Sequence, residues 1–234
     1  MSKTEKNRLK RLTKRLERIS RKCKTKPKAP VKPEKYCSCG PKVRLEDLVS
    51  LDCEMVGVGQ DRSCAIARCS LVDYQCRTLC DIYVKPDKPI TDYRTFVSGI
   101  RPCHMKNAIS LEEAVSIISE LVKDKIVVGH SLYNDLRLLN GLQKLDTRDT
   151  IKCERLKLKA LAVNCEKKGL ASLSYCLLKK KIQVGEHCSV EDAVATMQLF
   201  KYAHFDIRPE GNDCLSSLLT DNYWPSNIFE CCDR

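Results

Sequence analysis

The chain has 234 residues and a net charge of +12, and this length allows one domain of ordinary size and is too short for two. Residues 1–44 hold 17 basic and 3 acidic side chains, so the charge belongs to one end and the rest of the chain is nearly neutral. No stretch approaches the ~18 apolar residues of a transmembrane helix, and charges stand where a secretory signal would be apolar. We therefore expect neither a membrane protein nor a secreted one, and we expect the 16 cysteines to lie in a reducing compartment.

Residues 1–46 are predicted to form a disordered basic arm, because many like charges and a lysine-proline run leave too little apolar surface to offset the chain entropy. Leu9, Leu12, Leu16 and Ile19 recur there at helical spacing, so binding to RNA or to an acidic protein would order an amphipathic helix. A targeting run is the alternative, and the two roles are compatible. We expect the arm to direct the protein to the nucleus, with nucleolar enrichment and with ribosomal RNA or nucleolar partners; the cytoplasm is the alternative.

From Val49 onward, short runs of apolar and β-branched residues between turn residues predict strands, and three in succession predict an antiparallel meander. Farther along, Ser110 and Glu113 form a capping box before apolar residues at helical spacing, which predicts a helix. The predicted strands are 49–57, 63–74, 76–85, 126–128 and 146–150, and the predicted helices are 111–123, 131–140, 171–180 and 189–203.

A meander followed by alternating helices and strands predicts an α/β domain of three layers, with a mixed sheet flanked by helices. We place this domain at residues 47–208, after the arm, and assign residues 209–234 to a C-terminal tail. Residues 153–169 are polar and are expected to be irregular.

Asp52 and Glu54 lie on the first predicted strand, where residues two apart point to the same side of the sheet. Their carboxylates stand side by side, while Leu51, Cys53 and Met55 face the other way. Adjacent anions in an apolar strand repel each other unless a cation offsets the charge, and oxygen ligands of this kind suit magnesium or manganese. An edge strand with one solvated face is the alternative, and this segment alone does not choose between the two.

Three further polar residues stand at the starts of predicted helices, namely Asp135, His187 and Asp192. Asp135 follows a buried strand into a helix, where the helix dipole also favours an acid. Ser189 and Asp192 fit a capping box, which would give Asp192 a structural role. His187 lies in the loop before this cap, where a neutral imidazole can take a proton from a metal-bound water.

The order Asp-x-Glu, then Asp, then His-x4-Asp resembles the DEDDh branch of the DnaQ-like 3′ to 5′ exonucleases. Five segments are more specifically similar to the group formed by the interferon-stimulated exonuclease, the apoptosis-enhancing nuclease and RNA exonuclease 4. These segments are Leu51-Asp52-Cys53-Glu54-Met55-Val56-Gly57, Ala67-Arg68-Cys69-Ser70, Thr91-Asp92-Tyr93-Arg94-Thr95, Val97-Ser98-Gly99-Ile100 and Ser189-Val190-Glu191-Asp192-Ala193. The resemblance covers about residues 48–203 and includes neither the arm nor the tail.

This resemblance implies a ribonuclease H-like fold and a 3′ to 5′ exonuclease that releases nucleoside 5′-monophosphates from single-stranded RNA or DNA with a free 3′ end. It implies that Asp52, Glu54, Asp135 and Asp192 are catalytic metal ligands and that His187 is the general base. Two Mg²⁺ or Mn²⁺ ions, roughly 4 Å apart, would hold the scissile phosphate, one generating hydroxide from water and the other stabilising the leaving 3′ oxygen. The length of the link from residue 170 to residue 187 decides whether His187 reaches them.

Met55 and Arg94 are the candidate substrate-binding residues. Arg94 lies in a polar segment suited to phosphate or ribose contacts, with an ion pair to Asp92 as the alternative. The resemblance implies that Met55 packs against the terminal nucleotide, with an ordinary core position as the alternative. The sequence does not choose between RNA and DNA, or among ribosomal RNA processing, antiviral RNA decay and DNA degradation in cell death. The competing function is a nucleic-acid-binding factor for ribosomal RNA processing, in which the basic arm dominates.

Overall fold

The computed structural model describes residues 44–204, so the predicted arm up to residue 43, with its helix, and the predicted tail lie outside the described residues. Within residues 44–204, no helix has the length and the apolar character needed to cross a membrane.

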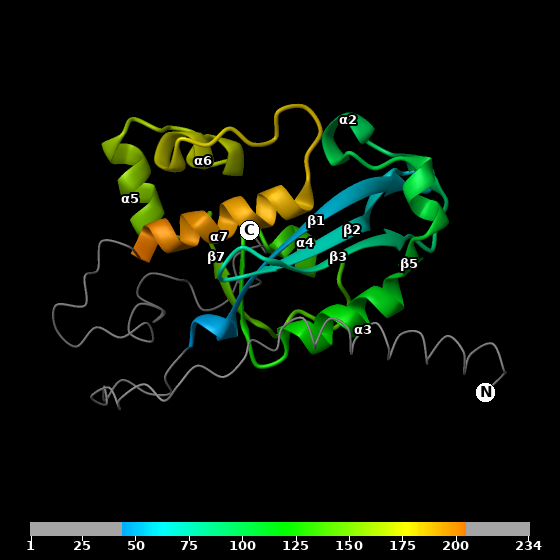
Figure 1. Ribbon diagram of the computed structural model, residues 1–234. Helices are drawn as coiled ribbons and strands as arrows, with labels where there is room; N and C mark the ends of the chain where they lie inside the picture. The colour runs from blue at the N-terminus through cyan, green and yellow to red at the C-terminus, as the bar shows by residue number, and fades with distance from the viewer. Residues whose placement is uncertain (1–43, 205–234) are drawn as a thin grey trace. The chain divides into compact units, whose positions relative to one another are not determined.

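A seven-stranded mixed sheet forms the centre of the domain, with the order β5-β3-β2-β1-β6-β7 and with β4 beside β1 (Figure 1). The strands are β1 (Leu48–Val58), β2 (Ser63–Asp73), β3 (Thr78–Lys85), β4 (Ile90–Asp92), β5 (Ile109–Ser110), β6 (Ile126–Gly129) and β7 (Asp146–Asp149). β1, β2 and β3 pair antiparallel in succession, which confirms the predicted meander. β6 runs parallel to β1, and β7 runs parallel to β6.

One edge of β1 is left open between two short neighbouring strands. β6 pairs only with the first three residues of β1, and β4 pairs only with Gly57 and Val58. The middle of β1, which carries Asp52 and Glu54, pairs with β2 on its other side, and none of the described strands pairs with it at this open edge. The short helix α4 (Tyr133–Leu136), which follows β6 in the chain, reaches this edge instead.

Helices cover both faces of the sheet, which confirms the predicted three-layer α/β architecture (Figure 1). α5 (Glu154–Ala162), α6 (Leu170–Leu178) and α7 (Ser189–His204) lie on one face, and α3 (Leu111–Val122) lies on the other. The remaining short helices are α2 (Thr95–Ser98) and the 3-10 helices η1 (Leu45–Asp47) and η2 (Pro102–Lys106). α7 is the inner helix of its layer, since it packs on β1 and β2 and contacts α6.

Apolar packing between α7 and the sheet fixes the position of this helix. Met197 and Phe200 of α7 are fully buried in one core cluster with Leu48 of β1 and Val128 of β6. Burying a side chain of this size stabilises a fold by about 1.5–3 kcal/mol. The apolar side of α7 therefore determines where its first turn stands over β1.

Residues 153–169 do not form the predicted irregular segment, because α5 occupies residues 154–162. Leu156 and Ala160 are buried, whereas Leu158 and Leu161 are about two-thirds exposed. The buried side of α5 is therefore narrow. Because leucines also lie on its exposed side, the sequence of α5 lacks a clear amphipathic pattern.

The helix predicted at 131–140 is shorter than expected, with only Tyr133–Leu136 in helical form. β4, β5, α2 and both 3-10 helices have no counterpart among the predicted elements. Segments of two to five residues are too short to show a period in the sequence.

Two cysteines on the central strands are buried and free. Cys53 is 8% exposed and Cys69 is 0% exposed, and neither belongs to a disulfide. They act as small apolar side chains in the sheet. Cys165 and Cys176, by contrast, form a disulfide that joins the segment after α5 to α6, and this pairing is not among the predicted features.

Candidate metal centre

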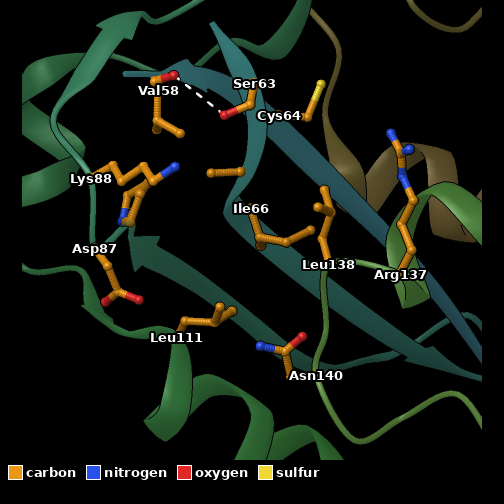
Figure 2. A pocket seen from close by; sticks show the side chains of 12 residues that line it. Val58, Ser63, Cys64, Ile66, Asp87, Lys88, Leu111, Arg137, Leu138 and Asn140 are labelled. Carbon is orange, nitrogen blue, oxygen red and sulfur yellow. Dashed lines mark hydrogen bonds between the residues drawn. The ribbon is translucent and has the colours of Figure 1, made fainter. Parts of the chain in front are cut away.

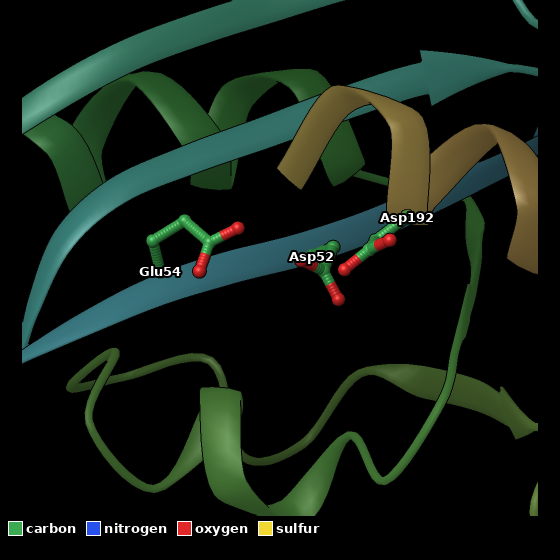
Figure 3. A group of neighbouring side chains, drawn as sticks. All are labelled: Asp52, Glu54 and Asp192. Atoms are coloured by element: carbon green, nitrogen blue, oxygen red, sulfur yellow. The ribbon is translucent and has the colours of Figure 1, made fainter. Parts of the chain in front are cut away.

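Three carboxylates from two distant parts of the chain meet above the middle of β1 (Figure 3). Asp52 and Glu54 point to the same side of β1, as strand alternation predicts, and Asp192 approaches them from the first turn of α7. One oxygen of each carboxylate lies within 4.8 Å of the other two. This spacing is compatible with shared oxygen ligation of a divalent cation.

Asp135, the fourth predicted ligand, stands at the open edge of β1. Its carboxyl is buried, which raises its pKa, and the neighbouring backbone and thiol of Cys53 act against this rise. Asp135 does not belong to the group within 4.8 Å, but its charge contributes to the raised pKa of Asp52 and of Glu54. The structure therefore brings all four acids together, with three in close contact and Asp135 beside them.

Asp149, which the sequence does not single out, sets the position of α4. Its Oδ1 accepts the N–H of Ser131 at 2.8 Å, and its Oδ2 accepts the N–H of Leu132 at 3.0 Å. Ser131 has a positive φ of 63°, so the chain turns sharply between β6 and α4, and the carboxylate stabilises this turn. The only sequence signal was an acid at the end of a predicted strand, a common position for solvent-exposed acids.

Burial raises the pKa of all four carboxyls, and neighbouring acids add to the effect. The pKa of Glu54 rises to about 8, that of Asp135 rises to about 7, and that of Asp52 lies well above its ordinary value. The pKa of Asp192 is raised as well. Glu54 Oε1 and Asp192 Oδ1 are buried and, among the described residues, have no hydrogen-bond partner. Because repelling carboxylates and unpartnered buried oxygens are both stabilised by a cation, these residues fit a divalent metal ion.

His187 lies next to this centre, so the link from residue 170 is long enough. Its Nδ1 is 3.8 Å from Asp192 Oδ2, and 30% of the side chain is exposed. The backbone N–H of His187 donates to the Val97 carbonyl of α2 at 2.6 Å. The preceding residue, Glu186, accepts a hydrogen bond from the Arg101 guanidinium at 2.8 Å within an ion pair. The loop before α7 is therefore fastened to α2 and to the segment after it.

The capping box predicted for Ser189 and Asp192 is not formed. α7 begins at Ser189 itself, and the Ser189 hydroxyl lies 2.7 Å from the hydroxyl of Ser70 on β2. The backbone N–H of Asp192 donates to the Cys188 carbonyl at 2.9 Å, as in any helix. Helix capping therefore does not account for Asp192, whose carboxylate turns to the other acids.

The two predicted substrate contacts lie outside the acidic group. Met55 is half-buried on β1. The Arg94 guanidinium donates to the Arg62 carbonyl at 2.9 Å and to Cys64 Sγ at 3.0 Å. The expected alternative, an ion pair with Asp92, is wrong, because Asp92 accepts a hydrogen bond from the Arg94 backbone N–H and not from its side chain. Arg94 therefore spans from the start of α2 to the turn between β1 and β2.

A separate hollow of about 280 Å³ shares none of the predicted catalytic residues (Figure 2). Its walls come from the end of β1, the start of β2, the link between β3 and β4, the start of α3 and the segment after α4, and they include Ile66, Lys88 and Arg137. The acidic group is therefore a site distinct from this hollow.

Comparison with known proteins shows the family of this chain. Residues 49–200 match the family model RNase_T, described as an exonuclease. The chain belongs to this exonuclease family. The matched segment runs from β1 into α7, so it contains Asp52, Glu54, Asp135, His187 and Asp192. The predicted exonuclease family is confirmed.

Two similar proteins each match more than two thirds of this chain. The human apoptosis-enhancing nuclease is 36% identical over 199 residues, which are 77% of this chain and 61% of that protein. RNA exonuclease 4 of Candida glabrata is 42% identical over 169 residues, which are 71% of this chain and 64% of that protein. The chain therefore spans less than two thirds of the length of these relatives.

A solved structure supports the ribonuclease H-like fold. The Saccharomyces cerevisiae apo Pan2 pseudoubiquitin hydrolase-RNA exonuclease module in complex with AAUUAA RNA is 26% identical to this chain, with a TM-score of 0.55. The similarity covers 69% of this chain and 29% of that one. The fold is therefore shared over most of this chain and over less than a third of the larger Pan2 chain.

The raised pKa values predict that the metal-free protein loses stability as the pH rises. A carboxyl with a higher pKa in the folded state binds more protons when the protein is folded. Its contribution to the free energy of unfolding is therefore complete below the unfolded pKa of about 4, and it is lost as the pH rises through the folded pKa. For Asp135 and Glu54 the folded pKa is about 7 and about 8. In EDTA, we expect the melting temperature to fall by about 5 °C or more between about pH 5 and about pH 8. Thermal unfolding followed by circular dichroism measures this.

Saturating Mn²⁺ should restore the melting temperature at the higher pH, and Glu54→Gln should flatten the pH dependence in EDTA because one of the titrating groups is removed. If the wild-type protein melts at the same temperature across this pH range in EDTA, the raised pKa values of these carboxyls are wrong.

Proposed function

We propose that this protein is a metal-dependent 3′ to 5′ exonuclease that hydrolyses single-stranded RNA or DNA and releases nucleoside 5′-monophosphates. The observation that carries the proposal is the meeting of Asp52, Glu54 and Asp192 within 4.8 Å. His187 stands beside them at 3.8 Å from Asp192. Membership of the exonuclease family supports the same reaction class. A purely structural role would not explain why acids that repel one another are buried together.

Asp52, Glu54, Asp135 and Asp192 are the proposed ligands of two divalent cations, Mg²⁺ or Mn²⁺. Carboxylate oxygens are preferred ligands for both ions. Bound cations would polarise the scissile phosphate, lower the pKa of a water molecule and stabilise charge on the leaving 3′ oxygen. The role of the protein is to hold the four carboxylates in place, and the backbones of β1, α4 and α7 provide this support.

His187 is the proposed general base. The neutral imidazole accepts a proton from the attacking water at Nε2, and Asp192 Oδ2, at 3.8 Å from Nδ1, stabilises the positive charge that forms. The hydrogen bond from the His187 backbone to Val97 keeps the ring near the site. Because 30% of the side chain is exposed, the ring can return its proton to solvent.

RNA is the substrate class that the comparison favours, since the similar Pan2 module is described in complex with AAUUAA RNA. We assign Met55 to packing against the terminal nucleotide and Arg94 to a phosphate or ribose hydroxyl of the substrate. Arg94 already has two hydrogen-bond acceptors in the protein, the Arg62 carbonyl and Cys64 Sγ. Substrate binding by Arg94 therefore requires either its free donor groups or an exchange of one of these contacts.

The first test of the function is Asp52→Asn, which removes one charge from the centre with little change in shape. We expect it to reduce digestion of a 5′-labelled single strand to background while the melting temperature in EDTA stays equal or rises, because one repelling charge is gone. The assay follows the shortening ladder on matched RNA and DNA strands, with Mg²⁺ or Mn²⁺ and with EDTA. The matched control is Asp87→Asn, an exposed acid outside the centre, which should digest like wild type. Undiminished digestion by Asp52→Asn would refute the proposal.

The second test is His187→Ala. We expect kcat to fall by about 10²- to 10⁴-fold, the usual contribution of a general base, while Mn²⁺ binding is preserved. The measurement is steady-state cleavage of a single-stranded oligonucleotide together with calorimetric titration of Mn²⁺. A loss of less than about tenfold would place the base on another residue.

A second candidate function rests on the basic arm, whose 17 basic residues by position 44 favour binding to structured RNA and a nuclear or nucleolar location. If the arm dominates RNA binding, affinity should fall steeply with salt and persist in EDTA, because release of counterions and not metal ligation drives it. Filter binding of the full chain and of a chain lacking residues 1–44 measures this. We expect the deletion to weaken binding and reduce the salt dependence; equal affinity of the two chains would exclude an arm-driven function.

A further inference from the structure

Gln183 contacts the metal centre from a segment outside the sequence motifs. It lies between α6 and α7, after Ile182, which is buried, and before Val184, which is 79% exposed. Its Nε2 donates to Asp192 Oδ2 at 2.7 Å, and its backbone N–H donates to Glu191 Oε2 at 3.3 Å. One residue therefore holds two neighbouring acids in the first turn of α7.

The backbone of Gln183 is in a conformation that residues other than glycine rarely adopt. Its φ is 56°, in the left-handed region. Such conformations persist where the surrounding structure enforces them, and they gather at functional sites. Here the burial of Ile182 in the core with α6 and α7 anchors the chain, and the turn directs the amide of Gln183 to Asp192.

This contact makes the two oxygens of Asp192 different from each other. Oδ2 is occupied by the amide of Gln183 and lies near His187 Nδ1. Oδ1 is buried and has no hydrogen-bond partner among the described residues. Because the carboxylate cannot rotate without breaking the 2.7 Å hydrogen bond, Oδ1 remains available to a cation held with Asp52 and Glu54.

The chemical nature of the donor matters as much as its position. An amide satisfies one lone pair of Asp192 without neutralising the carboxylate, so the acid keeps its full charge for a cation. A lysine at this position would form an ion pair with Asp192 and compete with a metal ion. Ligand carboxylates in metal sites are commonly oriented by outer hydrogen bonds of this kind.

We propose that Gln183 is a positioning residue that orients Asp192 so that its Oδ1 joins Asp52 and Glu54 in binding a divalent cation. The proposal rests on the proposed metal-dependent function, and it adds a residue of the α6–α7 link to the residues that form the proposed metal site. Gln183 itself touches neither the cation nor the substrate.

The test is calorimetric titration of Mn²⁺ into the full chain without nucleic acid, with Gln183→Met as the main variant. Methionine keeps the length and approximate volume of glutamine and removes the donor, so packing is retained. We expect the affinity for Mn²⁺ to fall by about 10- to 100-fold, the usual effect of removing an outer partner of a metal ligand. In the nuclease assay, the Mn²⁺ concentration for half-maximal rate should rise by a similar factor, with the KM for the oligonucleotide unchanged at saturating Mn²⁺.

Gln198→Met is the matched control. Gln198 lies on α7, and its side chain accepts a hydrogen bond from Lys180 at 2.9 Å, away from the acids. The same chemical change there should leave the Mn²⁺ titration as in wild type. Gln183→Glu keeps the shape but replaces the donor with a negative charge beside Asp192, so we expect it to weaken Mn²⁺ binding by a different route and to lower the melting temperature in EDTA.

Asp52→Asn in the same titration separates this proposal from the proposed function. If wild type binds Mn²⁺, Asp52→Asn does not, and a folded Gln183→Met binds as tightly as wild type, the positioning role is overturned and the metal centre stands. If wild type itself fails to bind Mn²⁺, both proposals fall. If Gln183→Met melts more than about 10 °C below wild type in EDTA, the hydrogen bond serves stability instead, and this too overturns the proposal.

Discussion

Repulsion among buried carboxylates is the constraint on which the rest of the structure depends. Asp52, Glu54 and Asp192 share a small volume on β1 and α7, and Asp135 stands beside them. Burial raises the pKa of each of these acids, and the other acids of the centre raise it further for Asp52 and Glu54, so holding them all as anions is unfavourable in the protein alone. A cation bound between them would remove this penalty, so the arrangement that is unfavourable in the protein alone would favour metal binding.

The elements that carry these acids are each fixed by contacts that do not involve them. Met197 and Phe200 anchor α7 in the core, and Asp149 stabilises the turn into α4 through two backbone amides. The loop before α7 is fastened by the ion pair of Arg101 with Glu186. The open edge of β1, between β6 and β4, leaves room for α4 to approach. Apolar packing and hydrogen bonds elsewhere thus offset the cost of the acidic centre, and they hold it in a fixed geometry.

The comparisons place this chain in an exonuclease family, and its relatives carry different names, such as apoptosis-enhancing nuclease and RNA exonuclease 4. An acidic centre of this kind would serve different substrates, because metal ligation and proton transfer do not depend on the identity of the base or sugar. Selection of the substrate must come from residues around the acids and from segments outside the common domain. In this chain, the residues proposed for this role are Met55 and Arg94 and the basic residues that precede β1.

The sequence by itself determined features that the local geometry of one strand or one helix sets. The alternation along β1 predicted that Asp52 and Glu54 share a face, and Ser110 with Glu113 predicted the start of α3, where the capping box is formed. Contacts between distant segments were decided only by the tertiary structure: the hydrogen bond of Gln183 to Asp192, the support of α4 by Asp149, and the bond of Arg94 to the Arg62 carbonyl. Local periodicity records which face of an element is buried, because burial repeats with the turn of a helix or the pleat of a strand. It carries no information on which polar groups meet across elements, since that depends on how whole helices and strands pack.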